Sequence, residues 1–230
     1  MEENAQQSVF EIVLASTVHD MKNSLGMLLN AIDRVVPQQA DQGGENQEDF
    51  NVIQYEAKRT NNALVKLLSL YKIDKQELPL NSDFHFLEDF IDEQLAEHQT
   101  LLQAKNINLS CEIEEDLEWS FDENLLSSVV NDVITNTIRY TKTKIVVRAY
   151  EAEACLYVEI ADDGDGYPSF MVENPSSYAL GVNFSTGSTG LGLYFASCIA
   201  ALHRNGDVAG SIDLLNGGEL GGGIFRIILP

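Results

Sequence analysis

The sequence predicts an α+β protein made of an N-terminal antiparallel helical hairpin and a C-terminal α/β sandwich. Two observations predict this division. Before about residue 78, apolar residues recur in steps of three and four, which is the spacing of helices. Beyond it, alternating strand-like segments are interleaved with amphipathic helices. Pro79 and the polar stretch Asn81 to Asp83 mark the boundary, so we predict domains at 1–78 and 79–230.

The N-terminal part contains two predicted helices, at about 8–36 and 48–75, joined by a polar connector that includes Pro37. Their apolar residues form heptad-like seams. One hairpin offers too little surface to cover both seams. We therefore expect a second copy to complete a four-helix bundle, giving a homodimer; packing of the hairpin on its own C-terminal domain is the alternative. The two seams consist of Val18, Met21, Leu25, Leu28, Ile32 and Val35, and of Ile53, Ala57, Thr60, Leu64, Leu67 and Tyr71.

The C-terminal part reads as strands covered by helices on one face. Asp122 and Glu123 begin one of these helices, where acidic residues suit the helix dipole. The run from Gly217 to Gly223 is interpreted as a flexible hairpin turn. The expected helices are 86–104, 123–140 and 189–202, and the expected strands are 107–113, 144–150, 156–161, 211–215 and 223–229.

Composition excludes several classes of protein. A net charge of -22 leaves no basic stripe for nucleic acid and disfavours an anionic membrane surface. No window approaches 18 uninterrupted apolar residues, and no basic region precedes the first apolar residues, so we expect neither a membrane span nor a secretory signal. The three separated cysteines are expected to be free thiols of a cytoplasmic protein. The acidic excess fits either solubility or a partner with a basic rim.

Asp162-Asp163-Gly164-Asp165-Gly166 follows a predicted strand. A carboxylate at a strand end can accept a hydrogen bond from an amino group such as that of adenine, and Gly164 and Gly166 would let the backbone approach a flat ring. The same residues also fit a turn or a fragment of a calcium loop.

A second glycine-rich stretch, Gly187 to Gly192, leads into a predicted helix. Free N–H groups at a helix start form an anion site. The spacing matches neither a Walker A loop nor a dinucleotide fingerprint, and close helix packing is the alternative explanation.

On the helix 123–140, Asp132, Asn136 and Arg139 share one face. Carboxylate and amide oxygens suit Mg²⁺, and a guanidinium suits phosphate. A solvated helix face is the alternative.

His19 directly follows the seam residue Val18 and should flank the bundle. Asp20 can hold the proton of one imidazole nitrogen and leave the other as a nucleophile. Asn23, one turn further on, could position a water or a phosphoryl oxygen. An ordinary surface histidine is the alternative.

Together these four elements resemble the catalytic core of a two-component sensor histidine kinase over nearly the whole sequence. His19-Asp20-Met21-Lys22-Asn23 resembles the family's histidine box, and Asp132 to Thr141 resembles its asparagine box. The two glycine boxes are similar to Asp162 to Gly166 and to Thr189-Gly190-Leu191-Gly192-Leu193. The stretch from Ala201-Leu202-His203 to Pro230 is also typical of the family.

This resemblance implies a dimerisation and histidine-phosphotransfer domain followed by an ATP-binding domain of the GHKL type. It implies autophosphorylation of His19 from Mg-ATP and transfer to an aspartate of a response-regulator receiver domain. Asn136 would hold Mg²⁺, Asp162 would bind adenine, and Arg139 and Tyr140 would contact phosphate and adenine. Asp20 and Asn23 fit the pattern that the family uses for phosphatase activity.

The sequence also departs from the family. Ser24 replaces a common proline, Asp132 replaces asparagine or glutamate, and no Lys or Arg occurs between Arg148 and Arg204. We therefore predict weak ATP binding or slow autophosphorylation. Only about ten residues precede the first helix, so for a complete chain we expect the signal to come from a separate sensor protein; for an excised fragment this expectation does not apply. The alternatives are a phosphotransfer or phosphatase module with little ATP turnover, a nucleotide-sensing docking scaffold and a GHKL serine kinase.

Overall fold

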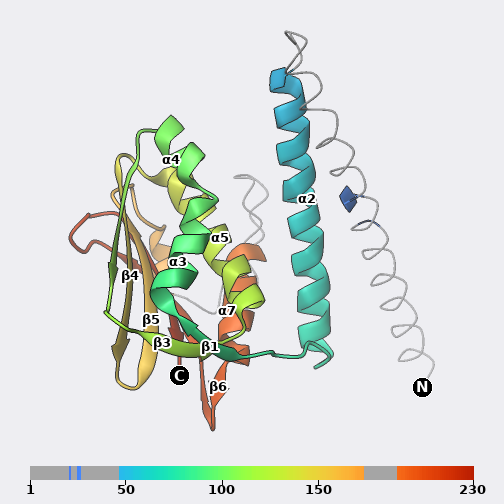
Figure 1. Cartoon of the computed structure of the whole chain (residues 1–230), viewed down its shortest axis with the longest axis vertical. Helices are drawn as coiled ribbons and strands as arrows, with labels where there is room; N and C mark the ends of the chain where they lie inside the picture. Colours follow the sequence, from blue (N-terminus) through green and yellow to red (C-terminus); the bar gives the residue numbers. More distant parts are fainter. Residues whose placement is uncertain (1–20, 22–24, 27–46, 174–190) are drawn as a thin grey trace. The chain divides into compact units, whose positions relative to one another are not determined.

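The structure, a computed structural model, describes residues 21, 25–26, 47–173 and 191–230. The chain divides into two compact units, Met1–Leu78 and Pro79–Pro230 (Figure 1).

The N-terminal unit contains helix α2, which spans Gln47–Asp74 and confirms the helix predicted at 48–75. Met21, Leu25 and Gly26 are also helical, while the rest of the predicted first helix lies outside the described residues. Along α2 the apolar side chains of Ile53 and Leu67 are 48% and 40% exposed. The helix thus keeps uncovered apolar surface, as the predicted seam requires.

A five-stranded mixed sheet forms the framework of the C-terminal unit. Its strand order is β2-β4-β5-β9-β8, in which β2 and β4 are parallel and the other neighbours are antiparallel. The strands are β2 (Asn108–Ile113), β4 (Lys144–Ala152), β5 (Cys155–Asp162), β8 (Ser211–Asn216) and β9 (Gly223–Leu229). All five were predicted from the sequence, within one to two residues at most ends.

Helices α3 (Leu87–Ala96), α5 (Glu123–Tyr140) and α7 (Leu191–Leu202) lie over one face of this sheet (Figure 1). Helix α5 begins and ends at the predicted residues, because Asp122 caps it by accepting a hydrogen bond from the Leu125 N–H at 3.1 Å. Apolar side chains of the helices and of alternate strand positions are buried between the two layers. The largest of these fully buried residues include Phe121, Phe195, Phe225, Leu126, Ile134, Ile145, Ile160 and Ile199.

The prediction of one helix at 86–104 was wrong. The segment begins with a strand, β1 (Asp83–Phe86), which pairs with the unpredicted strand β3 (Glu118–Phe121). The helical part is divided into α3 and α4 (Gln99–Ala104). At the break, His98 Nε2 lies 2.9 Å from Asn131 Oδ1 of α5, so a side-chain contact accompanies the interruption, without Pro or Gly.

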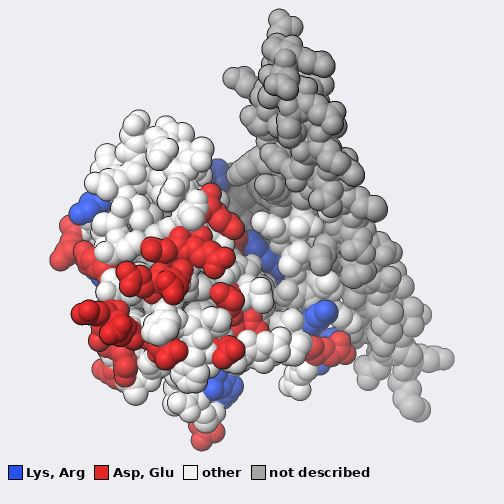
Figure 2. All heavy atoms as spheres, in the orientation of Figure 1, with Lys and Arg blue, Asp and Glu red and all other residues white. Residues whose placement is uncertain are grey.

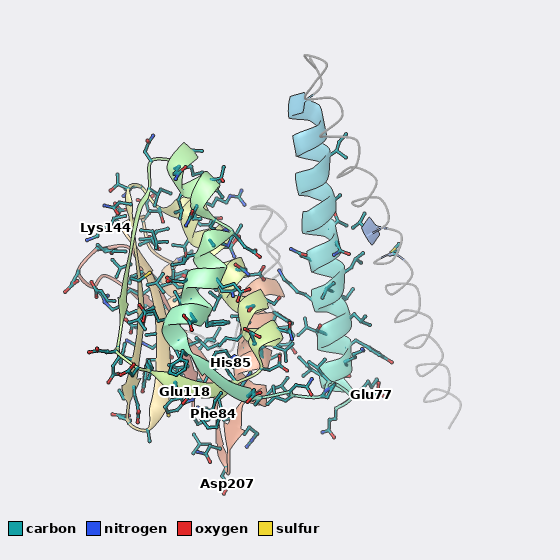
Figure 3. All side chains as sticks on the ribbon, viewed as in Figure 1. Glu77, Phe84, His85, Glu118, Lys144 and Asp207 are labelled. Carbon is teal, nitrogen blue, oxygen red and sulfur yellow. The ribbon has the colours of Figure 1, made fainter. Side chains whose placement is uncertain are left out.

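Three further short elements were not predicted. Strands β6 (Arg204–Asn205) and β7 (Val208–Ala209) form a small hairpin with Asp207 at its tip (Figure 3). Helix α6 spans Ser169–Glu173. Each is too short to give a periodic pattern in the sequence.

The outer face of the sheet, opposite the helices, carries a row of five charged residues, one from each strand. The five residues are in register and alternate in sign across the sheet. Arg226 Nη2 lies 2.7 Å from Glu159 Oε1, and Arg148 Nε lies 2.6 Å from Glu112 Oε2. We call this set the charged row; in sheet order it consists of Glu112, Arg148, Glu159, Arg226 and Asp213.

Acidic side chains dominate the visible face of the C-terminal unit (Figure 2). Among them, Glu88, Asp89, Asp92 and Glu93 of α3 are exposed. No helix in the described part of the chain is both long enough and apolar enough to span a bilayer.

Candidate functional site

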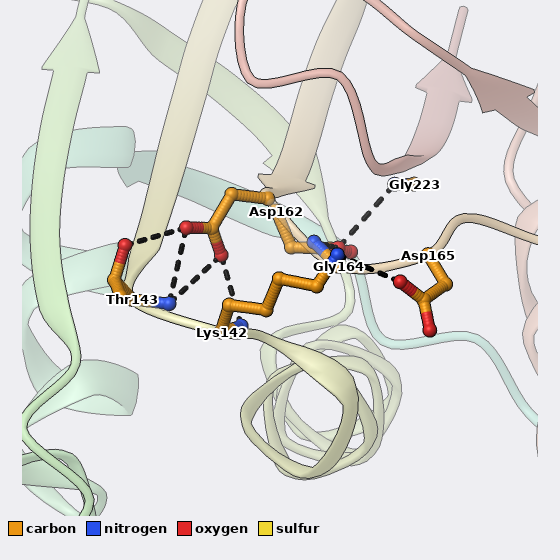
Figure 4. Close-up of polar contacts among 7 residues, drawn as sticks. Lys142, Thr143, Asp162, Gly164, Asp165 and Gly223 are labelled. Carbon is orange, nitrogen blue, oxygen red and sulfur yellow. Dashed lines mark hydrogen bonds and ion pairs between the residues drawn. The ribbon is translucent and has the colours of Figure 1, made fainter.

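The candidate site is built around Asp162, the last residue of β5. Its side chain is buried, with only 7% of the residue exposed. Asp162 Oδ1 accepts hydrogen bonds from the backbone N–H groups of Gly164 at 2.7 Å and Gly223 at 3.3 Å (Figure 4). These two bonds fix the carboxylate at the end of the strand.

Gly222 and Gly223 bring the turn before β9 directly against Asp162. The Gly222 N–H donates to the Asp162 carbonyl at 3.2 Å. A Cβ on Gly222 would lie 2.4 Å from that carbonyl oxygen and 2.6 Å from Oδ1, so only glycine fits. The sequence interpretation of this run as a flexible turn missed this role. A glycine pair at the entry of an apolar strand was the only signal available.

Gly164 joins the end of β5 to the end of α5. A Cβ at Gly164 would lie 2.6 Å from the Tyr140 carbonyl oxygen and 2.7 Å from Asp162 Oδ1. The backbone of Tyr140, the Gly164 α-carbon and the Asp162 carboxylate therefore meet at one point. The close approach observed at Gly164 is to protein backbone, and the approach of a flat ring to this glycine stays a prediction.

The polar face of α5 reaches this point through its last turn. Asn136, Arg139 and Tyr140 are exposed, and the Arg139 guanidinium carbon lies 5.7 Å from the centre of the Tyr140 ring. Asp132 is partly buried, and its Oδ2 lies 3.8 Å from the position of a Cβ on Gly192. The asparagine-box helix is thus adjacent to the first turn of α7.

Asp163 holds the turn between α5 and β4. Its carboxylate accepts hydrogen bonds from the Lys142 N–H at 2.9 Å and from the Thr143 N–H and hydroxyl at 2.9 and 2.6 Å. Burial alone would raise the pKa of Asp163, but the hydrogen bonds from Thr143 and from the backbone of residues 142–144 outweigh it and lower the pKa to about 2. The group is therefore fully ionised at neutral pH.

Lys142 and Asp165 form an exposed ion pair at 2.7 Å beside this turn (Figure 4). The hydrogen bond and the opposite charge raise the pKa of Lys142 and lower the pKa of Asp165. Both side chains are largely solvated, so the pair contributes little stability. Its effect on the site is electrostatic, because Asp165 partly neutralises the lysine that lies beside Asp162.

The segment after the first glycine box is fixed by Asn216 at the end of β8. Its Oδ1 accepts from the Tyr167 N–H, and its Nδ2 donates to the Tyr167 carbonyl, both at 2.7 Å. Gly166 has a φ of +78°, and a Cβ there would lie 2.7 Å from Asn216 Oδ1. Gly166 is therefore required by conformation and by space, and Asn216 is a second residue that sequence reasoning missed.

Several predicted site residues lie outside the described residues. These are His19, Asp20 and Asn23 of the histidine box and Thr189 and Gly190 of the second glycine box. Leu191 begins α7, followed by Gly192 and the partly buried Leu193.

Comparison with known proteins agrees with this geometry. Residues 121–230 match the sequence model of the family described as "Histidine kinase-, DNA gyrase B-, and HSP90-like ATPase". The matched residues include Asp132, Asp162 and the start of α7. Among curated proteins, the chain is 24% identical over 222 residues to the sensor protein SrrB of Staphylococcus aureus strain N315. That alignment covers 94% of this chain but 37% of SrrB.

Solved structures show the same fold. The Acinetobacter baumannii histidine kinase AdeS superposes with a TM-score of 0.62 at 19% identity, covering 90% of this chain and 95% of that one. Full-length ShkA, solved in complex with AMPPNP, gives 0.70 at 18% identity, covering 94% of this chain and 45% of that one. The catalytic domain of the histidine kinase ThkA gives 0.56 at 23% identity, covering 65% of this chain and 97% of that one.

Proposed function

We propose that this chain is the catalytic core of a histidine kinase. In this proposal it binds Mg-ATP, phosphorylates His19 and transfers the phosphoryl group to an aspartate of a response-regulator receiver domain. One observation carries the proposal: the Asp162 carboxylate, the end of α5 and the glycine turn before β9 meet around Gly164. This convergence places a buried acceptor next to the backbone of Tyr140, whose side chain is exposed, in the part of the chain that matches the ATPase family model.

The described residues fit an adenine nucleotide. Asp162 Oδ1 is held by two N–H donors, while Oδ2 receives no hydrogen bond from the described residues and can accept from an adenine amino group. Tyr140 is 59% exposed and presents a ring for contact with the base. Arg139 carries a charge suited to phosphate.

The site also fits a magnesium ion carried by the nucleotide. No group of three or more His, Cys, Asp or Glu side chains in the described part of the chain could hold a metal alone. Mg²⁺ at this site would therefore be bound by the Asn136 amide oxygen, with Asp132 one turn away, and by phosphate oxygens. When bound, Mg²⁺ would neutralise phosphate charge.

His19, Asp20 and Asn23 supply the acceptor half of the proposed reaction. Asp20 would hold one imidazole nitrogen protonated, which leaves the other nitrogen free to attack the γ-phosphorus. The P–N bond forms as the bond to the ADP oxygen breaks, and ADP leaves. In the reverse role, Asn23 would orient a water toward a phosphorylated receiver aspartate, giving phosphatase activity.

The whole assembly is also part of the proposal. The chain spans 37% of the length of SrrB, so the partners of that sensor protein are not carried over. We propose a homodimer, because α2 exposes apolar residues along the predicted seam. A receiver domain is the proposed macromolecular substrate.

A second candidate is a phosphotransfer or phosphatase module that hardly uses ATP. The observation that favours it is the absence of Lys and Arg between Arg148 and Arg204 in the sequence. In addition, Lys142, which lies beside the first glycine box, is paired with Asp165. Phosphate neutralisation would then depend on Arg139, backbone N–H groups and the metal.

The test is incubation with γ-labelled ATP and Mg²⁺, followed by addition of candidate receiver domains. We expect slow labelling of the wild type, no labelling of His19→Ala, and transfer of label to a receiver. Label on the protein that persists in His19→Ala would contradict the proposed acceptor. No labelling, together with dephosphorylation of a pre-phosphorylated receiver that requires Asn23, would favour the second candidate.

A further inference from the structure

We propose that Asp163 is a positioning residue of the nucleotide site. Its carboxylate ties the turn after α5 to the end of β5 and thereby fixes Arg139 and Tyr140 relative to Asp162. The inference rests on the proposed function, because it assigns a role in nucleotide binding. In the sequence, Asp163 lies between Asp162 and Gly164. Its side chain faces away from the Asp162 acceptor and into the α5–β4 turn.

The Asp163 carboxylate accepts several hydrogen bonds from the turn between α5 and β4. Asp163 Oδ1 accepts from the N–H groups of Lys142 and Thr143, both at 2.9 Å. Oδ2 accepts from the Thr143 N–H at 3.0 Å and from its hydroxyl at 2.6 Å. In addition, the Asp163 N–H donates to the Lys144 carbonyl at 3.2 Å. One residue therefore satisfies every N–H of the turn at residues 142 and 143.

Only Thr141 separates this turn from Tyr140, which belongs to the proposed nucleotide site. Thr141 caps the end of α5: its N–H and its hydroxyl both bond the Thr137 carbonyl, at 2.9 and 2.7 Å. Tyr140 is thus one residue from this cap and two from the turn that Asp163 holds. Movement of residues 142 and 143 would displace the last helical turn of α5.

On the other side of Asp163 in the sequence, Gly164 packs against the backbone of Tyr140. The Tyr140 carbonyl fits against Gly164 only because glycine has no Cβ, and Gly164 adjoins both Asp163 and the Asp162 carboxylate. By holding residues 142 and 143, the Asp163 hydrogen bonds keep Tyr140 in contact with Gly164 without themselves taking part in the site. The side chain also remains an anion at neutral pH, since the same hydrogen bonds lower its pKa to about 2.

Asp163→Ala removes the whole set of bonds, whereas Asp163→Asn keeps one carbonyl oxygen for the two N–H donors. Asp165→Asn is the matched control, because it removes one negative charge from the same loop and weakens only the Lys142 side-chain ion pair, while the backbone hydrogen bonds of the turn stay in place. The measurements are the Kd of a fluorescent ATP analogue, KM and kcat for autophosphorylation, and amide hydrogen exchange at Lys142 and Thr143. All are made on the full chain.

We expect Asp163→Ala to raise Kd and KM about tenfold, which corresponds to loss of one charge-assisted hydrogen bond. Asp163→Asn should raise them about threefold or less, with kcat at saturating ATP changed less than about twofold in both variants. Exchange at Lys142 and Thr143 should be faster in the alanine variant without nucleotide. Asp165→Asn should not weaken binding.

Equal Kd values for Asp163→Ala and Asp165→Asn would overturn the inference, as would unchanged amide exchange. If Asp163→Ala does not fold, Thr143→Val removes only the 2.6 Å bond, and unchanged Kd in both Thr143→Val and Asp163→Asn would also overturn it. A wild type that binds no adenine nucleotide would contradict the proposed function instead. In that case the exchange data still decide whether Asp163 holds the turn.

Discussion

At the scale of single residues, both protein hydrogen bonds to the Asp162 carboxylate fall on the same oxygen, Oδ1. The two donors come from opposite directions in the sequence, Gly164 just after the strand and Gly223 at the start of β9. The carboxylate is therefore oriented before a ligand is present. In the proposed nucleotide site, Oδ2 would then accept from the ligand, and the fixed carboxylate would lower the reorganisation needed on binding.

Gly222 should be intolerant of any side chain. In Gly222→Ala the new Cβ would lie 2.4 Å from the Asp162 carbonyl oxygen, so the backbone must move and the bonds to Asp162 weaken. We expect a loss of about 2–4 kcal/mol in the free energy of unfolding together with weaker nucleotide binding. Urea denaturation and analogue titration measure the two effects. Gly192→Ala, whose Cβ would lie 3.8 Å from Asp132 Oδ2, is the control, and should change stability by about 1 kcal/mol or less.

His203 should make the C-terminal unit sensitive to acid. Its Nε2 accepts from the Asp122 N–H at 3.0 Å and its Nδ1 donates to the Ile199 carbonyl at 2.9 Å, so the folded state needs the neutral ring. Burial lowers its pKa below the ordinary value of 6.5. The stabilisation is therefore complete above pH 6.5 and is lost as the pH falls toward the folded-state pKa, at about 1.4 kcal/mol per unit of pKa difference.

The comparison of wild type with His203→Gln isolates this effect. Gln can accept and donate in similar directions but does not titrate. Urea midpoints from pH 8 to pH 5 should fall more steeply for the wild type than for the variant. Parallel pH profiles would show that His203 does not control the acid response.

The sequence pointed to Asp162 and Gly164, which the structure brings together, but not to the residues that hold them in place. Asp162 and Gly164 stand out because a carboxylate and a glycine after a strand form a recognisable motif. Gly222, Asn216 and Asp163 did not stand out, because the partners of Gly222 and Asn216 are 60 and 49 residues away and those of Asp163 lie in a preceding turn, and single-sequence patterns carry no such pairing. The histidine-box residues stay a prediction.

At the scale of elements, the charged row is expected to stabilise the central strands of the sheet. Glu159 Oε1 receives Arg226 Nε at 2.8 Å and the Tyr150 hydroxyl at 3.0 Å, and its side chain is 8% exposed. Glu159→Ala would leave Arg226 and Tyr150 without this acceptor. We expect a loss of about 2–4 kcal/mol by chemical denaturation.

Asp213→Ala is the matched control, because it removes another acid of the charged row. Asp213 is 40% exposed and its Oδ2 lies 3.6 Å from Arg226 Nη1. The expected loss is below about 1 kcal/mol. If the two variants lose similar free energies of unfolding, the buried Glu159 stabilises the sheet no more than the exposed Asp213 does.

Element prediction succeeded where burial imposes a regular period. Helix α5 was predicted residue for residue, since its buried side chains repeat along one face and Asp122 caps it. The pair β1 and β3 was missed because each strand has four residues, and Phe84 and Phe86 of β1 are 66% and 51% exposed (Figure 3). Both strands alternate polar and apolar residues, DFHF and EWSF, but four residues are too few to distinguish a strand from other structure.

At the scale of the whole molecule, the exposed seam of α2 predicts self-association. Leu67→Glu places a charge on an apolar position that is 40% exposed in one chain. We expect it to weaken the dimer by at least about tenfold, because burying an unpaired carboxylate in an apolar interface is unfavourable. Sedimentation equilibrium measures the change. Asn62→Glu, at an exposed position outside the seam, should leave the dimer intact, and monomeric wild type would contradict the prediction.

Asp122 has a consequence for how this unit can be joined to other proteins. Its Oδ2 accepts from the Asn81 N–H at 2.8 Å, its Oδ1 caps α5, and its own N–H donates to His203. The stretch after Pro79 is therefore bonded to the start of the helix that ends at Tyr140. For building chimeras, a cut after Asn81 would remove a hydrogen-bonded partner of Asp122, whereas a fusion junction before Pro79 keeps it. Any twist applied at Asn81 would act on the first turn of α5.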